Sequence, residues 1–113
     1  MPRSTRNPLP RRSRAPVFAA LGDDTRLALL TRLAGGNRHS ISGLTAGSPL
    51  SRQAITKHLR VLADAGLVHA VREGRESLFE FDPRPIQDAS QYLDRISQHW
   101  DQALARLKTF VEN

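Results

Sequence analysis

Glycine and proline interrupt the chain between residues 16 and 85 so often that only short helices and strands can form there. The interruptions are Gly22, Gly35-Gly36-Asn37, Gly47-Ser48-Pro49, Gly66, Gly74 and Asp82-Pro83-Arg84-Pro85. Between them, apolar periodicity predicts helices over 17–21, 24–34, 40–46 and 52–65, then β-strands over 67–72 and 77–81. One long helix is predicted after the last proline, over 86–111. The predicted fold is mainly α with one small β-hairpin.

Capping residues and apolar stripes support the central helices. Asp23 and Ser51 stand where N-caps are expected, just before the helices over 24–34 and 52–65. The residues expected to face the core are Leu27, Leu30 and Ala34, widened by Leu29 and Leu33, then Ile41 and Leu44, then Ile55, Leu59 and Leu62. A short helix, a turn and a capped basic helix form a helix-turn-helix. The hairpin after it, with Glu73-Gly74-Arg75-Glu76 as a four-residue loop, would be a wing.

Helical spacing places five polar residues on the outer face of the 52–65 helix, namely Arg52, Gln53, Thr56, Lys57 and Arg60. Their chemistry suits the major groove of DNA, because Arg reads guanine and Gln reads adenine through paired hydrogen bonds. We expect Arg52 and Gln53 to read bases. The other three, and Ser51 at the N-terminus of the helix, are expected mainly to hold phosphates, although a threonine can also touch a thymine methyl group. The alternative is an ordinary solvated helix face.

His58 and two wing arginines extend the candidate DNA surface. His58 lies on the flank of the same helix, where it either donates to a phosphate or packs between two helices. Arg72 and Arg75 lie at the predicted hairpin tip, which can enter a narrow minor groove. Glu73 and Glu76 beside them weaken that interpretation, and an ordinary charged hairpin is the alternative.

Positive charge is concentrated in two stretches of the chain, whose formal net charge is +6 at pH 7. Residues 1–14 contain five arginines and no acidic residue, and residues 51–75 contain five basic residues against two acidic ones. Clustered positive charge favours a polyanionic partner, first nucleic acid and second an anionic membrane. Because residues 1–15 are rich in Arg, Pro and Ser, we expect a disordered basic arm there, which either solubilises the chain or adds phosphate contacts.

No cysteine occurs among the 113 residues, which excludes disulfides, thiolate metal sites and cysteine nucleophiles. No apolar run approaches the ~20 residues that span a bilayer, and the basic N-terminus lacks the apolar segment of a secretory signal. We therefore expect a cytoplasmic protein with no membrane partner. The motifs of serine hydrolases, phosphate-binding loops and zinc peptidases are also missing, so neither an enzyme nor a cofactor is expected.

Apolar residues of the last helix repeat every seven positions in two registers, one with Ile86, Leu93, Trp100 and Leu107 and the other with Ala89, Ile96, Ala103 and Phe110. This pattern continues for nearly four heptads and is typical of helices that pair with another helix. So small a domain offers such a helix few surfaces to cover. The segment over 83–113 is therefore expected to form a dimer.

Three motifs, in this order, resemble the ArsR-type winged helix-turn-helix repressors: Phe18-Ala-Ala-Leu-Gly-Asp-Asp-Thr-Arg26, Ser51-Arg-Gln-Ala-Ile-Thr-Lys-His-Leu-Arg-Val-Leu62, and Ala65-Gly-Leu-Val68 leading into Arg72-Glu-Gly-Arg75. The resemblance covers residues 16–82. It implies a homodimer that binds an imperfect palindrome near its own promoter and releases it on a signal. It also places residues 51–53 and 56–58 in the recognition helix. With N- and C-terminal helices in the interface, the expected dimer contacts are Phe18, Leu21, Ile86, Ala89, Leu93, Ile96, Trp100, Leu104 and Leu107.

The metal sites of this family are not matched. Its first site needs cysteines near the short third helix, where this chain has Ile41-Ser-Gly-Leu44. Its second site begins with Asp-x-His, whereas Asp88-Ala-Ser90 has no histidine, and the later pair is replaced by Asp101 and Leu104. His99 stands alone on the last helix. The end segment is similar to a metal-free branch of the family, and the effector remains open between a small organic molecule, a protein and none.

The sequence therefore predicts a basic arm over 1–15, a winged helix-turn-helix core over 16–82 and a dimerisation helix over 83–113. The predicted function is sequence-specific binding of double-stranded DNA by a homodimeric repressor. The alternative is a winged-helix module that binds other proteins and has only non-specific affinity for DNA. Such a module would lose DNA at moderate salt and would show no sequence preference.

Overall fold

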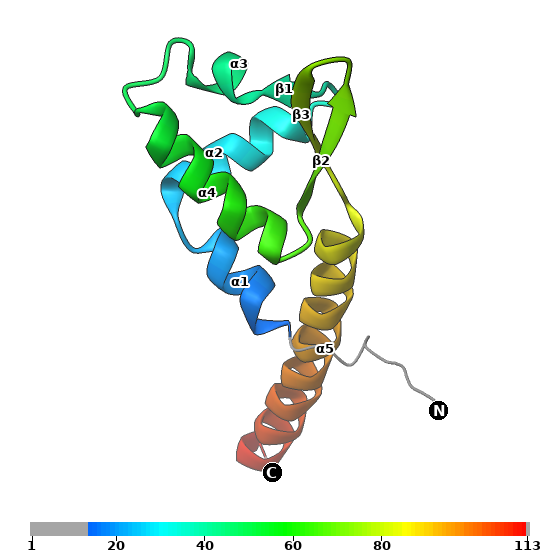
Figure 1. The fold of residues 1–113 in the computed structure, drawn as a ribbon. Helices are drawn as coiled ribbons and strands as arrows, with labels where there is room; N and C mark the ends of the chain where they lie inside the picture. The colour runs from blue at the N-terminus through cyan, green and yellow to red at the C-terminus, as the bar shows by residue number, and fades with distance from the viewer. Residues whose placement is uncertain (1–13, 113) are drawn as a thin grey trace, which may run out of the picture.

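The computed structural model describes residues 14–112, and this part of the chain is mainly helical with one small sheet (Figure 1). In chain order the elements are α1 (Ala15–Leu21), α2 (Asp24–Leu33), β1 (His39–Ser40), α3 (Ile41–Thr45), α4 (Arg52–Asp64), β2 (Val68–Glu73), β3 (Glu76–Phe81) and α5 (Arg84–Glu112). The predicted fold class is confirmed. Of the predicted arm over 1–15, residues 1–13 lie outside the described residues, and Ala15 already begins α1.

Side-chain caps begin the central helices where the sequence indicated. The Asp23 carboxylate accepts a hydrogen bond from the Arg26 backbone N–H at 3.0 Å, and the Ser51 hydroxyl accepts one from the Ala54 N–H at 3.1 Å. Ser40 caps the short α3 in the same way. Each cap satisfies an amide that a helix leaves without an internal partner. The starts of α2 and α4 are therefore determined locally.

The hydrophobic core lies between α2, α3, α4 and the base of the hairpin. Ile55, Leu59 and Leu62 of α4 are each no more than 1% exposed, which confirms the predicted inner stripe of this helix. Leu44 of α3 and Leu67, just before β2, are fully buried against them. The inner stripe of α4 is thus covered completely, whereas Val61 on the same helix is 37% exposed and the face opposite the stripe stays open.

The predicted inner face of α2 needs a correction. Leu27 is 43% exposed and Ala34 also faces solvent, whereas Leu29, Leu30 and Leu33 are buried. The elements α1, α4 and β3 contact only part of the arc of α2 over which its five apolar positions are spread. Packing against those neighbours, and not the periodicity alone, selects the residues that face inward.

A third strand joins the predicted hairpin, and the sheet order is β1-β3-β2 with all pairs antiparallel. In β1, His39 pairs with Phe79 and Ser40 with Leu78. This strand is not predictable from the sequence, because two residues carry no alternating pattern. β1 ties the start of the helix-turn-helix to the middle strand of the sheet.

The hairpin turn is shorter than predicted. Glu73 pairs with Glu76 in the ladder, so Gly74 and Arg75 alone form the turn and the four-residue loop is wrong. A two-residue hairpin turn needs a positive φ at its first central position, and Gly74 supplies it with φ of +60°. Arg75 is thereby held at the tip of the wing.

Helix α5 begins two residues earlier than predicted, at Arg84. The prediction placed the start of the helix after the last proline, but Pro85 lies in the first turn, where a helix needs no N–H from it. The first intrahelical bond runs from the Gln87 N–H to the Pro83 carbonyl at 2.9 Å. At 1.5 Å per residue α5 is about 43 Å long, and Figure 1 shows its C-terminal half extending away from the other elements.

Among residues 14–112, no helix has both the length and the apolar character that crossing a membrane requires.

Asp82 joins the wing to α5. Its side chain is 8% exposed, and its Oδ2 lies 2.7 Å from Nε2 of His69 and accepts a bond from the Arg84 guanidinium at 2.6 Å. Its Oδ1 accepts from the Arg84 backbone N–H at 3.0 Å, and its own N–H donates to the Leu67 carbonyl at 2.9 Å. The bonds from Arg84 hold the pKa of Asp82 well below its usual range despite burial. This carboxylate therefore fixes how α5 leaves the hairpin.

We predict that Asp82→Asn lowers the free energy of unfolding at pH 7 by ~1–3 kcal/mol, because His69 and Arg84 lose a charged acceptor. The pKa of Asp82 is depressed by folding, so its contribution to stability is fully present above the ordinary value of 3.8 and is lost progressively as the pH falls from there toward the lower pKa of the folded state. Urea titrations should therefore give a smaller difference between the two proteins at pH 3 than at pH 7. Asp101→Asn, at an exposed carboxylate of α5, should change stability by less than ~0.5 kcal/mol. An equal loss for Asp82→Asn at both pH values would contradict the prediction.

Candidate nucleic-acid interface

The connection between α3 and α4 sets the direction in which α4 leaves the core. Gly47 has φ of +76°, a conformation that favours glycine, and the Leu50 N–H donates to the Ser48 hydroxyl at 3.1 Å. Leu50 is partly buried and packs against the core. In Figure 1, α4 lies along one side of the molecule, with α3 between its N-terminal end and the hairpin. The outer face of α4 is consequently free to meet another molecule.

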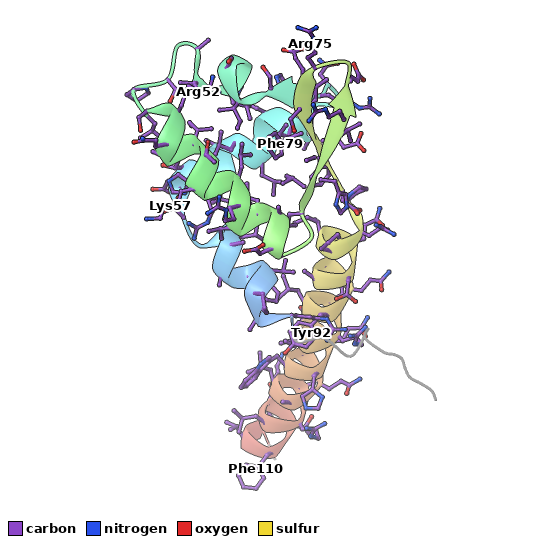
Figure 2. All side chains as sticks on the ribbon, viewed as in Figure 1. Arg52, Lys57, Arg75, Phe79, Tyr92 and Phe110 are labelled. Carbon is purple, nitrogen blue, oxygen red and sulfur yellow. The ribbon has the colours of Figure 1, made fainter. Side chains whose placement is uncertain are left out.

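A shallow hollow of about 400 Å3 lies over that outer face, lined by Arg52, Gln53, Thr56, Lys57 and Arg60. These are the five residues that helical spacing assigned to one face, and the structure brings them together. Three are cations and none is acidic, so the hollow is electropositive. Figure 2 shows Lys57 on the side of α4 that faces away from the hairpin, and Arg52 at the end of α4 that lies next to α3. Ser51 stands at the end of the face and uses its hydroxyl oxygen for the cap.

Two side chains of the hollow are already held by neighbours. The Arg52 guanidinium donates to the Ser42 hydroxyl of α3 at 2.6 Å, which orients this arginine from outside α4. The Thr56 hydroxyl donates to the Arg52 carbonyl at 2.7 Å. Ser42 was not among the predicted site residues, because only the folded turn brings it near Arg52.

His58 lies on the inner flank of α4 and not in the hollow. Its side chain is 24% exposed, and its Nδ1 is 3.5 Å from the Arg26 guanidinium and 3.9 Å from the Asp23 carboxylate. Of the two roles considered for this histidine, these contacts favour packing between α2 and α4. Arg26 also donates to the carbonyls of Ala20 at 2.8 Å and Ala19 at 3.2 Å, near the C-terminus of α1. One arginine, to which the sequence analysis assigned no role, thus joins α1, α2 and α4.

The wing presents its arginines apart from the hollow. Arg72 and Arg75 are exposed, and Figure 2 shows Arg75 at the end of the hairpin. Arg38 forms ion pairs with Glu73 and, at 3.0 Å, with Glu80. Glu73 was expected to weaken the basic character of the tip, and Arg38 offsets part of its charge. The three residues also brace the two strands against the segment before β1.

Helix α1 and its N-cap are attached to the N-terminal third of α5 by polar and aromatic contacts. Arg14 forms a paired ion contact with Asp88 at 2.8 and 3.3 Å and stacks 4.8 Å from the centre of the Tyr92 ring. Phe18 packs on the same ring with centroids 6.3 Å apart. These contacts orient α5 relative to the rest of the protein.

The residues expected at a dimer interface fall into three groups by their burial in the protomer. Ala89 is 4% exposed, and Ile86 and Leu21 pack against the core of the same chain. Phe18 and Ile96 are half-buried. The remainder lie farther along α5 and are 50–62% exposed, namely Leu93 in its N-terminal half and Trp100, Leu104 and Leu107 in its C-terminal half. Phe110 and Val111 continue this exposed apolar surface to the end of the helix.

No group of three or more His, Asp or Glu side chains within residues 14–112 is arranged to hold a metal ion. His99 is exposed on α5.

A helix-turn-helix with an open cationic second helix, followed by a short antiparallel wing, defines a winged helix-turn-helix DNA-binding protein. The sequence matches a helix-turn-helix domain family over residues 21–71, from the end of α1 into β2. The solved structure of an ArsR-like transcriptional regulator from Rhodococcus sp. RHA1 is 42% identical, covers 86% of this chain and 91% of its own, and superposes with a TM-score of 0.79. The chain belongs to the ArsR family of winged helix-turn-helix transcriptional regulators.

Two other proteins extend the comparison. The uncharacterized HTH-type transcriptional regulator YuzN of Bacillus subtilis is 38% identical over 78 residues, which are 64% of this chain and 85% of YuzN. Mb0332 from Mycobacterium bovis, a possible ArsR-family regulator, was solved as a homodimeric winged helix-turn-helix DNA-binding domain. It is 22% identical, covers 78% of this chain and 82% of its own, and has a TM-score of 0.59, so it shows the fold alone. The family is one of DNA-binding regulators.

We predict that Arg26→Ala lowers the free energy of unfolding by ~1–3 kcal/mol, because α1 loses two donors near its C-terminus and His58 loses a neighbour. Arg26→Lys should recover only part of this loss, since an ammonium group lacks the planar fork that reaches both carbonyls. Urea titration at neutral pH measures both changes. Arg106→Ala on the exposed surface of α5 is the control and should stay within ~0.5 kcal/mol of the wild type. A lysine variant as stable as the wild type would show that the fork geometry does not matter.

Proposed function

We propose that this regulator is a homodimeric repressor that binds a palindromic operator near its own promoter. The observation that carries the proposal is the electropositive hollow on the outer face of α4, whose inner face is fully buried. A helix held rigidly in this way can enter the major groove without rearranging, so its side chains meet base edges in one geometry.

The roles proposed for individual side chains follow from their reach and chemistry. Arg52 and Gln53, in the first turn of α4, are the base-reading residues. Ser51, Lys57 and Arg60 hold phosphates, which position the protein without reading sequence. The wing arginines, Arg72 and Arg75, enter a minor groove beside the site. Arg38 forms an ion pair with Glu73 and so reduces the repulsion between this carboxylate and the phosphates. His58 positions α4 through α2 and acts on DNA only indirectly.

Dimerisation is supported by the exposed apolar residues on the C-terminal half of α5. An apolar surface that continues along a helix at heptad spacing marks a contact with another helix. The homodimeric state of Mb0332, which shares the fold, is consistent with a second copy of this chain as the partner. Two copies would present two α4 helices about one DNA turn apart, near 34 Å, or at a multiple of that spacing.

The remaining parts of the proposal concern regulation and location. The core over 16–82 binds DNA, the helix over 83–113 dimerises, and the arginine-rich arm over 1–15 adds sequence-independent phosphate contacts. Repression in the cytoplasm would end when a small molecule or a protein partner binds. A metal effector is not proposed, because the cysteines and paired histidines of the family's metal sites are absent from the sequence.

Selection of duplexes from random DNA tests the function. The full chain should enrich a palindromic sequence, bind it in excess non-specific competitor DNA, and bind the DNA upstream of its own gene. A protein-docking module would enrich no sequence and would lose DNA at moderate salt.

A matched pair of substitutions on the selected duplex separates base reading from phosphate binding. Gln53→Ala should weaken binding by ~1–3 kcal/mol and relax the preference at one base pair of each half-site. Lys57→Ala should weaken all sequences alike and lower the slope of log affinity against log salt by about 0.9 for each half-site. Titrations at several salt concentrations measure both, and a changed base preference in the lysine variant would overturn its assigned role.

Charged residues in place of Leu93 and Trp100 should produce monomers that bind the selected duplex weakly. The two side chains are 50% and 62% exposed, so the substitutions leave the core of the protomer intact while opposing an apolar contact with a second copy. Sedimentation gives the mass, and circular dichroism shows whether the variant stays folded. A folded variant that keeps the mass of a dimer would show that α5 pairs elsewhere.

A further inference from the structure

We propose that Thr56 contacts the C5 methyl group of a thymine in each half-site and thereby selects that base. The inference rests on the proposed function and deepens it. The observation behind it is the place of Thr56 in the hollow. Thr56 is the one short side chain among the residues that line the hollow, its hydroxyl is hydrogen-bonded to the backbone, and longer polar side chains surround it. The sequence alone favoured a phosphate contact for this residue, and the structure argues against that role.

The hydroxyl of Thr56 is already engaged. It donates to the Arg52 carbonyl at 2.7 Å, and a hydroxyl has only one proton to donate. Phosphate oxygens accept hydrogen bonds and cannot donate them, so a phosphate contact would break the bond to Arg52. Thr31, Thr45 and Thr109 make the same bond to the carbonyl four residues earlier, which marks it as the favoured arrangement of a helical threonine in this protein. Thr56 therefore has no proton for a phosphate, and what it can offer a ligand is its methyl group or an acceptor oxygen.

The position of Thr56 gives this methyl group a specific target. Arg52 and Arg60 lie four residues before and after Thr56, and Gln53 lies three before it, so all are its neighbours on the helix face. Thr56 is half-buried, whereas the side chains around it are exposed. Thr56 thus forms the floor of the hollow, and the longer side chains extend past it toward base edges and phosphates. Of the groups in the major groove, the thymine methyl is the apolar one, and it suits an apolar floor.

The experiment uses the full chain and the duplex of highest affinity selected from random DNA. Each thymine in turn is replaced by deoxyuridine, which removes only the C5 methyl group. At one thymine of each half-site the wild-type affinity should fall about fourfold, the factor expected for one methyl group that loses an apolar contact. Every other replacement should leave the affinity nearly unchanged.

Two variants assign the effect to Thr56. Thr56→Val keeps a methyl group and removes the hydroxyl, so it should remain sensitive to the same deoxyuridine. Thr56→Ser keeps the hydroxyl and removes the methyl group, so it should bind the thymine and deoxyuridine duplexes equally. Thr31→Ser is the matched control, because Thr31 makes the same backbone bond outside the hollow, and it should behave as the wild type. Thermal unfolding verifies that each variant is folded.

Several results would overturn the inference. One is a wild-type protein indifferent to every deoxyuridine, or a selected half-site without thymine. Another is a Thr56→Val variant that loses affinity for all sequences and has a smaller slope of log affinity against log salt, which would show that the Thr56 hydroxyl binds a phosphate. A third is a Thr56→Ser variant that keeps its preference for thymine. In each case selective binding by the wild type would still support the proposed function, whereas failure to select any sequence would remove the function and the inference together.

Discussion

The burial of one face of α4 is the interaction on which the rest of the structure depends. Ile55, Leu59 and Leu62 are almost wholly removed from water, and each such side chain contributes roughly 1.5–3 kcal/mol. Exposed ion pairs such as Arg14–Asp88 contribute between ~0 and 1 kcal/mol, so apolar packing fixes α4 in place. Because the helix is amphipathic, the same packing turns its cations outward. The stability of the core and the geometry of the candidate DNA surface are therefore set by the same contacts.

Polar clusters then connect α4 and the wing to the helices expected to form a dimer. Arg26 contacts His58 and the C-terminus of α1, and Asp82 holds His69 of the hairpin and Arg84 of α5. Neither cluster lies in the hollow, yet both set angles between elements.

Much of the candidate site was predictable because it lies on one helix. Residues four apart on a capped helix share a face whatever the rest of the chain does, so Arg52, Thr56 and Arg60 could be grouped from their numbers alone. The orientation of each side chain could not be predicted this way. The bond from Arg52 to Ser42 crosses the turn between two helices, and the inward position of His58 depends on Arg26, 32 residues away.

The features of the fold can be separated in the same way, into those set by local sequence and those set by contacts between distant segments. Caps, glycines and apolar periodicity act within a few residues, so they located α2, α4, the hairpin and α5 without knowledge of their neighbours. Features that depend on contacts between distant segments required the folded chain. The strand β1 exists only because β3 lies beside it. Leu27 is exposed because the elements that pack on α2 cover only part of the arc over which the apolar residues of this helix are spread. Ile86 and Ala89 shared a heptad pattern with Leu93 and Trp100, and packing near the start of α5 buried the first pair and left the second exposed. Periodicity identifies which residues share a face, whereas the neighbour that covers this face is chosen by packing across the whole chain.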